Sequence, residues 1–283
     1  MTSPSAWAPY EELRQQAIDT AVCYLPISSR RGQSAELRKR NQTTIMKLRD
    51  SLIYRSEAII WHVTLLSRIQ EQALAKLYST FPNPNAPYDI ARATARDQQF
   101  VFDDVVFNCI ALFDYVGNIV GFAYYGDRRR KAKWGRIQKY ARDEEFDRRD
   151  NINVRIARGA VGELICESQN VLVSRLNDYR ADLLHYETVP AGGGVTTRLA
   201  KNSVGTSDLS FDLKITVPKP FAKRFVVPGY EADGAKATLV HAAEWVAGQS
   251  HARCRRILRE LERDLRREAG RDPDGTDRVI DMS

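Results

Sequence analysis

An arginine and a histidine, Arg180 and His185, lie five positions apart near the end of a predicted helix. Arginine is a permanent cation that binds phosphate, and histidine exchanges protons near neutral pH. Such a pair could bind or cleave a phosphodiester. Five positions along a regular helix rotate by about 500°, which leaves the two side chains about 140° apart. They can therefore share one substrate only if the helix breaks between them or if two subunits assemble the site. Alternatively, Arg180 forms an ordinary surface ion pair with Asp178 or Glu187.

Several common mechanisms have no matching motif in the chain. It has no G-x-x-x-x-G-K-[ST] loop, no H-E-x-x-H helix and no C-x-x-C pair among its four cysteines, so we expect no metal and no cofactor. His62 lies among apolar helix residues, and we interpret it as a core or edge histidine. His241 and His251 are ten positions apart, the wrong spacing for a shared metal, and we interpret both as structural or surface residues. The N-terminus has no apolar signal core, and no uninterrupted apolar run approaches about eighteen residues. We therefore expect a cytoplasmic protein that does not enter a membrane.

Apolar residues that recur at threes, fours and sevens predict the helices that position this pair. Helices are expected at about 9–24, 34–79, 93–125, 153–185 and 232–269, with Pro26 ending the first. Gly192–Gly194 is interpreted as a flexible turn. Alternating polar and apolar residues over 210–217 predict a strand with one buried face, and Phe225–Val227 is its expected partner. The predicted fold class is mostly α, a bundle of four to five long helices with a small β-hairpin insertion, at about 190–230, between the last two.

One narrow polar stripe crosses the most apolar of these helices. It consists of Asp104, Asn108, Tyr115 and Asn118, whose spacing places them within one arc of a regular helix. Buried polar groups need partners, so the stripe must face something polar. It is either a hydrogen-bonded seam of the core or part of the lining of a site, for which Asp104, Asn108 and Tyr115 are the candidates.

The segment Arg128–Arg142 contains eight basic residues and no acidic one, within a chain of net charge +7. Trp134 and Tyr140 are interleaved with the cations, a combination that suits single-stranded RNA. The candidate nucleic-acid contacts are Arg128, Arg129, Arg130, Lys131, Lys133 and Arg136. The alternative is a solvated segment between helices, compensated by the acidic residues at 143–145 that follow.

The segment Tyr179–His185, which ends a helix in a small bundle, resembles the R-x4-6-H motif of the HEPN superfamily. The apolar helix around Phe102–Tyr115 is also similar to the central helix of one HEPN branch. The resemblance covers about residues 40 to 265. It implies a HEPN-like helical bundle that works as a homodimer and cleaves single-stranded RNA without a metal. His185 would be the general base, Arg180 would hold the scissile phosphate, and Asp182 would orient the imidazole.

One departure from the pattern bears on this activity. Active members carry a polar residue after the arginine, and this chain has Ala181. The alternative function is therefore a catalytically silent helical module that binds RNA or a partner protein, as an adaptor or an accessory subunit. The resemblance also implies a toxin or defence role, with an antitoxin or a nucleotidyltransferase-type protein as partner. The expected organisation is an N-terminal helical arm at 1–33, one HEPN-like domain at 34–270 and a disordered tail at 271–283.

Overall fold

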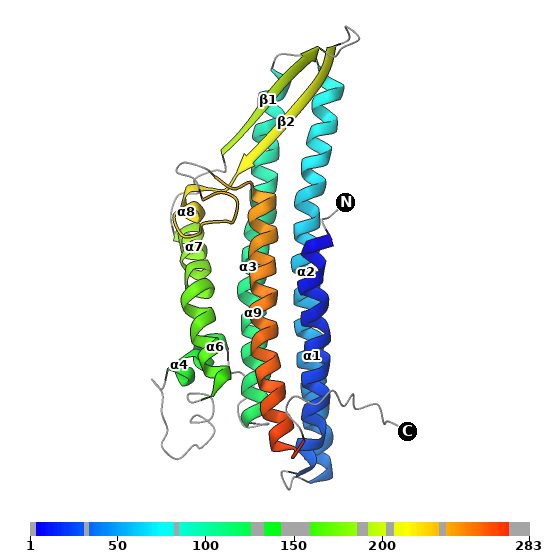
Figure 1. Ribbon diagram of the computed structural model, residues 1–283, viewed down its shortest axis with the longest axis vertical. Helices are drawn as coiled ribbons and strands as arrows, with labels where there is room; N and C mark the ends of the chain where they lie inside the picture. Colours follow the sequence, from blue (N-terminus) through cyan, green and yellow to red (C-terminus); the bar gives the residue numbers. More distant parts are fainter. Residues whose placement is uncertain are drawn as a thin grey trace. The chain divides into compact units, whose positions relative to one another are not determined.

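The computed structural model describes residues 4–30, 34–81, 85–125, 133–142, 159–185, 192–201, 207–231 and 236–271. Most of these residues are helical, and a single two-stranded hairpin lies between the last two long helical segments (Figure 1). The prediction of a mostly α fold with a small β-hairpin insertion is thus confirmed. The expected tail at 271–283 lies, apart from Arg271, outside the described residues.

Four long helices carry most of the chain. They are α1 (Pro4–Arg30), α2 (Ala35–Thr80), α3 (Ala86–Tyr125) and α9 (Leu239–Glu268). The shorter helical elements are α4 (Trp134–Ala141), α6 (Ala160–Ser168), a π-helical turn η2 (Gln169–Val173), α7 (Ser174–His185) and α8 (Lys219–Ala222). Because α6, η2 and α7 follow one another without a gap, residues 160–185 form one helical segment, shorter than the predicted 153–185.

The prediction that Pro26 ends the first helix is wrong, since α1 contains both Pro9 and Pro26 and continues to Arg30. A proline inside a helix removes one backbone hydrogen bond and costs about 3 kcal/mol. Tyr24 and Ile27, on either side of Pro26, have no exposed surface, so core packing offsets this cost. Pro26 is thus a residue that ordinarily ends a helix, but the burial of its neighbours keeps α1 helical.

The strand pairing also differs from the prediction. The antiparallel partner of β2 (Ser207–Thr216) is β1 (Gly192–Lys201), in a one-to-one register from Gly192 opposite Thr216 to Lys201 opposite Ser207. The glycines expected to form a flexible turn therefore begin a strand. Phe225 and Val227, expected to pair with β2, are instead buried in the core. Three consecutive glycines hid the strand signal of the β-branched residues that follow them.

The chain divides into two compact units, and α2, α3 and α9 each contribute one part to both. Unit 1 contains residues 59–107 and 175–247, together with the first two residues. Unit 2 contains residues 3–58, 108–174 and 248–283. The last part of α9 belongs to the same unit as α1, and the boundaries expected at 33/34 and 270/271 stay a prediction.

An aromatic cluster forms the core of unit 1. The ring of Phe221 in α8 lies 5.0 Å from that of Phe102 in α3, 5.5 Å from that of Tyr179 in α7 and 4.7 Å from that of Phe225. The pairs with Phe102 and Tyr179 are edge-to-face, and such pairs add about 0.5–1.5 kcal/mol each to the burial of their area. This cluster holds α7 against α3 and α8. The hairpin contacts α2 in the same unit, where the Tyr78 and Phe211 ring centroids lie 4.9 Å apart.

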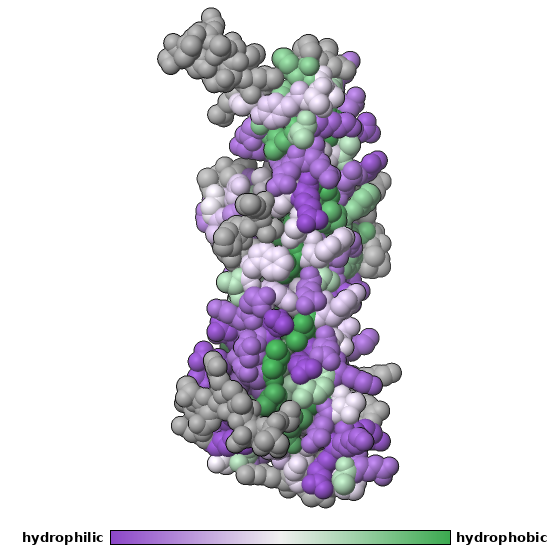
Figure 2. All heavy atoms as spheres, turned by 90° about the vertical axis from the view of Figure 1, so that its right-hand side faces the viewer, coloured by the Kyte–Doolittle hydropathy of each residue, from purple (hydrophilic) through white to green (hydrophobic). Residues whose placement is uncertain are grey.

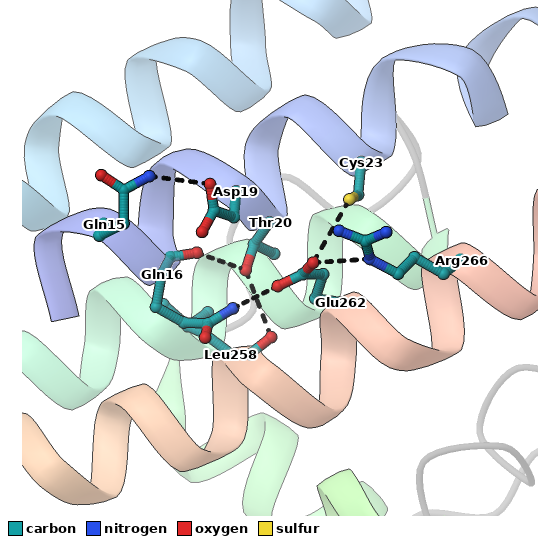
Figure 3. A network of polar contacts seen from close by, with 8 residues as sticks. All are labelled: Gln15, Gln16, Asp19, Thr20, Cys23, Leu258, Glu262 and Arg266. Carbon is teal, nitrogen blue, oxygen red and sulfur yellow. Dashed lines mark hydrogen bonds and ion pairs between the residues drawn. The ribbon is translucent and has the colours of Figure 1, made fainter. Parts of the chain in front are cut away.

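In unit 2, α1 packs against α9 through apolar residues and one polar network. Leu13 of α1 and Leu258 of α9 have no exposed surface. Beside them, the Glu262 carboxylate accepts hydrogen bonds from Gln16 Nε2 at 2.6 Å and from Arg266 Nε at 2.7 Å (Figure 3). The Thr20 hydroxyl lies 3.3 Å from the Leu258 carbonyl oxygen. Every drawn member of this network has a partner, so it explains polar residues at a helix interface without requiring a ligand.

The apolar character of α3 reflects its position in the core. By length and composition, Ala86–Tyr124 could cross a membrane, and 72% of its most apolar window is buried inside the protein. On the face shown in Figure 2, hydrophilic side chains predominate, and strongly hydrophobic ones form narrow strips between them.

Candidate functional site

Positions 180 and 185 lie on one unbroken helix, because α7 is helical from Ser174 to His185. The geometric expectation therefore applies without change, and the two positions point about 140° apart around the helix axis. Arg180 and His185 could share one substrate only through a helix break between them or through two subunits, and α7 has no such break. Only assembly across two subunits would bring an Arg180 and a His185 together. The His185 side chain itself lies outside the described residues.

Arg180 presents its charge at the surface of unit 1. Its guanidinium carbon lies 5.9 Å from the centroid of the Phe107 ring, within the range of a cation–π contact. Within the described part of the chain it forms no ion pair, and Asp178 is not its partner. Arg180 is thus held against an aromatic face, and Glu187, the other expected ion-pair partner, lies outside the described residues.

Asp182 forms an ion pair with Arg224. One carboxylate oxygen lies 2.7 Å from Nη1 of Arg224, and both side chains are about a quarter exposed, at 25% and 24%. The same guanidinium nitrogen donates a hydrogen bond to the Pro220 carbonyl oxygen at 2.8 Å. Asp182 therefore joins α7 to the end of α8, and its charge is balanced by Arg224. Its expected role in orienting the His185 imidazole stays a prediction, because the His185 side chain lies outside the described residues.

Sequence reasoning missed a second acid in this region, Asp103. The Tyr179 hydroxyl donates a hydrogen bond to Asp103 Oδ1 at 2.7 Å. Burial raises the pKa of Asp103 to about 6, although the Tyr179 hydrogen bond opposes the shift. Burial, with the nearby Asp103 charge, also raises the pKa of Tyr179 far above its ordinary value. The sequence could have identified Asp103, because it is a carboxylate next to the core residue Phe102 in a helix that is apolar over most of its circumference.

The polar stripe on α3 is paired with α2 within each unit. In unit 1, Asp104 Oδ2 lies 3.7 Å from Nε2 of His62. In unit 2, Arg55 donates a hydrogen bond to the side-chain oxygen of Asn108 at 2.5 Å, and its guanidinium lies 5.8 Å from the Tyr115 ring centroid. These contacts favour the hydrogen-bonded seam over the lining of a site, because each of the three candidates already contacts a side chain of α2.

A buried serine and histidine meet in unit 2, where Ser56 Oγ lies 2.9 Å from Nε2 of His251. Neither residue has exposed surface. Burial lowers the pKa of His251 to about 4, so the ring is neutral at physiological pH. A nucleophile must reach its substrate, and this pair cannot. The prediction that His251 is structural is therefore confirmed.

The basic segment contains the short helix α4, whose two faces differ sharply. Trp134 and Tyr140 are buried, and Trp134 Nε1 donates a hydrogen bond to the Gln169 side-chain oxygen at 2.7 Å. These rings are therefore not available to stack on bases, contrary to our expectation. Lys133 and Arg136 are exposed, as are Lys139 and Arg142. Four of the candidate contacts, Arg128, Arg129, Arg130 and Lys131, lie outside the described residues.

The α4 helix is fixed firmly enough to hold those cations in place. The backbone N–H of Trp134 donates to the Asp114 carboxylate at 2.9 Å, and the Trp134 ring packs 5.0 Å from the Phe113 ring. Arg136, Lys139 and Arg142 follow at intervals of three, which spreads them over about 120° of the helix surface. This arrangement can neutralise successive phosphates of a nucleic-acid backbone.

Among the described residues, no group of three or more His, Cys, Asp or Glu side chains could hold a metal ion. The comparisons with known proteins add no family, since no family model, curated protein or solved structure matches the chain. What the protein does must therefore be argued from its own residues.

Proposed function

We propose that the protein is a helical RNA-binding module that holds the phosphate backbone of single-stranded RNA through the basic face of α4 and does not cleave it. The observation that carries the proposal is the division of α4 into a buried aromatic face and an exposed cationic face. Lys133 and Arg136 are exposed, and in the described part of the chain neither has an ion-pair partner. Cations held in this way are available to phosphates.

The buried aromatic residues set the kind of binding that is expected. Because Trp134 and Tyr140 do not reach solvent, α4 offers no stacking platform for bases. Recognition by this face would be electrostatic, tolerant of sequence and strongly dependent on salt. Each phosphate contact contributes about 0.7 to the slope of log K against log salt for a single strand.

Titration of a fluorescein-labelled single-stranded RNA by anisotropy, at several potassium chloride concentrations, tests the proposal. Lys133→Gln with Arg136→Gln should weaken binding at least several-fold and reduce the salt slope by about 1.4. Lys76→Gln with Lys214→Gln removes the same charge from exposed positions of unit 1 and should leave both quantities unchanged. Equal losses in the two double variants, or no binding by the wild type, would overturn the proposal.

A metal-independent endoribonuclease is the second candidate, favoured by Arg180, whose charge has no acidic partner among the described residues. On the unbroken helix α7, His185 and Arg180 would have to come from two subunits. Incubation of the same RNA in excess chelator, with Arg180→Ala and His185→Ala as controls, separates the candidates. Cleavage that is lost in both variants would establish the nuclease, and binding without cleavage supports the silent module.

A further inference from the structure

The π-helical turn η2 (Gln169–Val173) interrupts the helical segment at 160–185. Turns of this kind are rare, occur mostly as single turns within α-helices, and are frequent at functional sites. The core does not require one here, since six buried residues of the segment already recur at threes and fours, as in a regular α-helix. They are Val161, Ile165, Ser168, Leu172, Leu176 and Tyr179. The reason for the turn must therefore lie on another face of the segment.

Two consecutive amides of η2 bind the two ends of α4. The Gln169 side-chain oxygen accepts a hydrogen bond from Nε1 of Trp134, the first residue of α4, at 2.7 Å. The Asn170 side-chain oxygen accepts one from Nη2 of Arg142, the C-cap of α4, at 3.0 Å. A turn closed by i→i+5 bonds contains more residues than an α-helical turn, so consecutive side chains diverge by a smaller angle. The π-helical turn thus allows both amides to face α4 together.

These two contacts set the direction in which the cations of α4 point. Arg136 follows Trp134 by two positions, which rotates it by about 200° around the helix axis. Because the Trp134 indole is bound to η2, position 136 faces the opposite side of α4, where its side chain is exposed. Gln169 and Asn170 are uncharged, so their hydrogen bonds hold α4 without neutralising a cation.

We propose that η2 fixes the orientation of α4, with Gln169 and Asn170 as positioning residues that direct its exposed cations toward the RNA backbone. This inference rests on the proposed binding of RNA by α4. It adds that the affinity for RNA depends on two neutral side chains that act through Trp134 and Arg142. Gln169→Leu should therefore weaken RNA binding although it changes no charge, by about 2- to 10-fold in Kd, the range for one neutral hydrogen bond.

Proton–nitrogen correlation NMR spectra of the full chain test the docking contact without RNA. The chain contains four tryptophans, and the indole N–H signal that is absent from the spectrum of Trp134→Phe belongs to Trp134. Gln169→Leu should move this signal, because the indole loses its acceptor, and should leave the other three indole signals in place. Those three signals report that the variant is folded. A Trp134 signal that does not move would overturn the inference, whether or not the protein binds RNA.

Titration of the labelled single-stranded RNA then tests the consequence for binding. In the Trp134→Phe background the indole donor is absent, so adding Gln169→Leu should change Kd by less than about 2-fold. Gln72→Leu makes the same substitution at an exposed position of α2 in unit 1 and should leave Kd unchanged. Equal losses in Gln169→Leu and Gln72→Leu would overturn the inference. So would a loss from Gln169→Leu that is the same with and without the Trp134 indole.

Asn170→Ala keeps the inference falsifiable if Gln169→Leu does not fold, because Asn170 is exposed. It should weaken RNA binding, and the difference should disappear in the Arg142→Gln background. An Asn170→Ala protein that binds RNA as tightly as the wild type would overturn this positioning role. A wild type that does not bind RNA would reject the proposed function. A Trp134 signal that still moves in Gln169→Leu would separate that result from a failure of the docking contact.

Discussion

Asp103→Asn should make the protein more stable at neutral pH and should change how its stability depends on pH. In the folded protein, burial raises the pKa of Asp103 from 3.8 to about 6, so the folded state binds the proton more tightly than the unfolded state. The stability that comes from the protonated carboxyl is fully present below about pH 3.8 and is lost as the pH rises through about 6. Asparagine carries no charge at any pH and still offers an oxygen to the Tyr179 hydroxyl.

The magnitude follows from the size of the shift. A change in pKa from 3.8 to about 6 corresponds to about 3 kcal/mol in the free energy of unfolding, at about 1.4 kcal/mol per pH unit. The Asp103 side chain is partly exposed, so solvent screening brings the expected effect to about 2 to 3 kcal/mol. The difference in stability between Asp103→Asn and the wild type should therefore grow by this amount between about pH 4 and pH 7.5.

The Asp103→Asn variant is needed because His251 changes the stability of the wild type with pH in the direction opposite to Asp103. Its pKa is lowered by burial from 6.5 to about 4, so the stability from the neutral ring is present above about pH 6.5 and is lost as the pH falls through about 4. In the wild type the two effects partly cancel across the same pH range. Asp103→Asn removes one of them and should expose the acid sensitivity that is due to His251.

Urea-induced unfolding followed by circular dichroism, at several pH values between about 4 and 7.5, measures this difference. Asp97→Asn is the matched control, since it removes the same charge from a side chain of the same helix that is 50% exposed. It should alter stability by less than about 0.5 kcal/mol at every pH. A difference between Asp103→Asn and wild type that does not vary with pH, or an Asp103→Asn protein less stable than wild type at neutral pH, would refute the reasoning.

Three further substitutions test the contacts on which the fold depends. Ser56→Ala should cost about 1 to 3 kcal/mol, because the buried His251 ring loses its hydroxyl partner; urea midpoints equal to wild type would contradict this. Phe221→Ala should lower the free energy of unfolding by about 3 to 5 kcal/mol, because it removes the ring that contacts Phe102 and Tyr179. A loss below about 1 kcal/mol in the same urea titration would count against the aromatic core. Asp182→Asn should lower the free energy of unfolding by about 1 kcal/mol or less, because it removes the ion pair with Arg224, and added salt should reduce this effect. The exposed Asp178→Asn is the control. A loss of stability that does not depend on salt would argue against the ion pair.

The sequence predicted helices well where apolar spacing was long and regular, as in α2, α3 and α9. It failed where one local signal competed with packing. Pro26 is a strong local stop, but the burial of Tyr24 and Ile27 keeps the helix intact. The glycines before Val195 signalled a turn, but pairing with β2 makes them part of a strand.

The candidate site shows the same limit more clearly. The rotation between Arg180 and His185 could be worked out from helix geometry alone, and the unbroken α7 leaves it unchanged. The partner of Asp182 could not be worked out in this way, because Arg224 lies forty-two positions away in the sequence. The burial of Trp134 and Tyr140 could not be predicted from the sequence either, since a helix of eight residues has too few turns for residue spacing to show which side is covered.

By itself, the sequence determined the mostly helical class, the inserted hairpin and the presence of a basic segment, because these depend on residues close together in the chain. Only the tertiary structure decided that Asp103 meets Tyr179, that Ser56 meets His251, and that Gln70 and Tyr78 of α2 bind the backbone of β2. Those contacts join residues far apart along the chain. They depend on which buried polar groups find partners once the helices have packed, and no local pattern records that outcome.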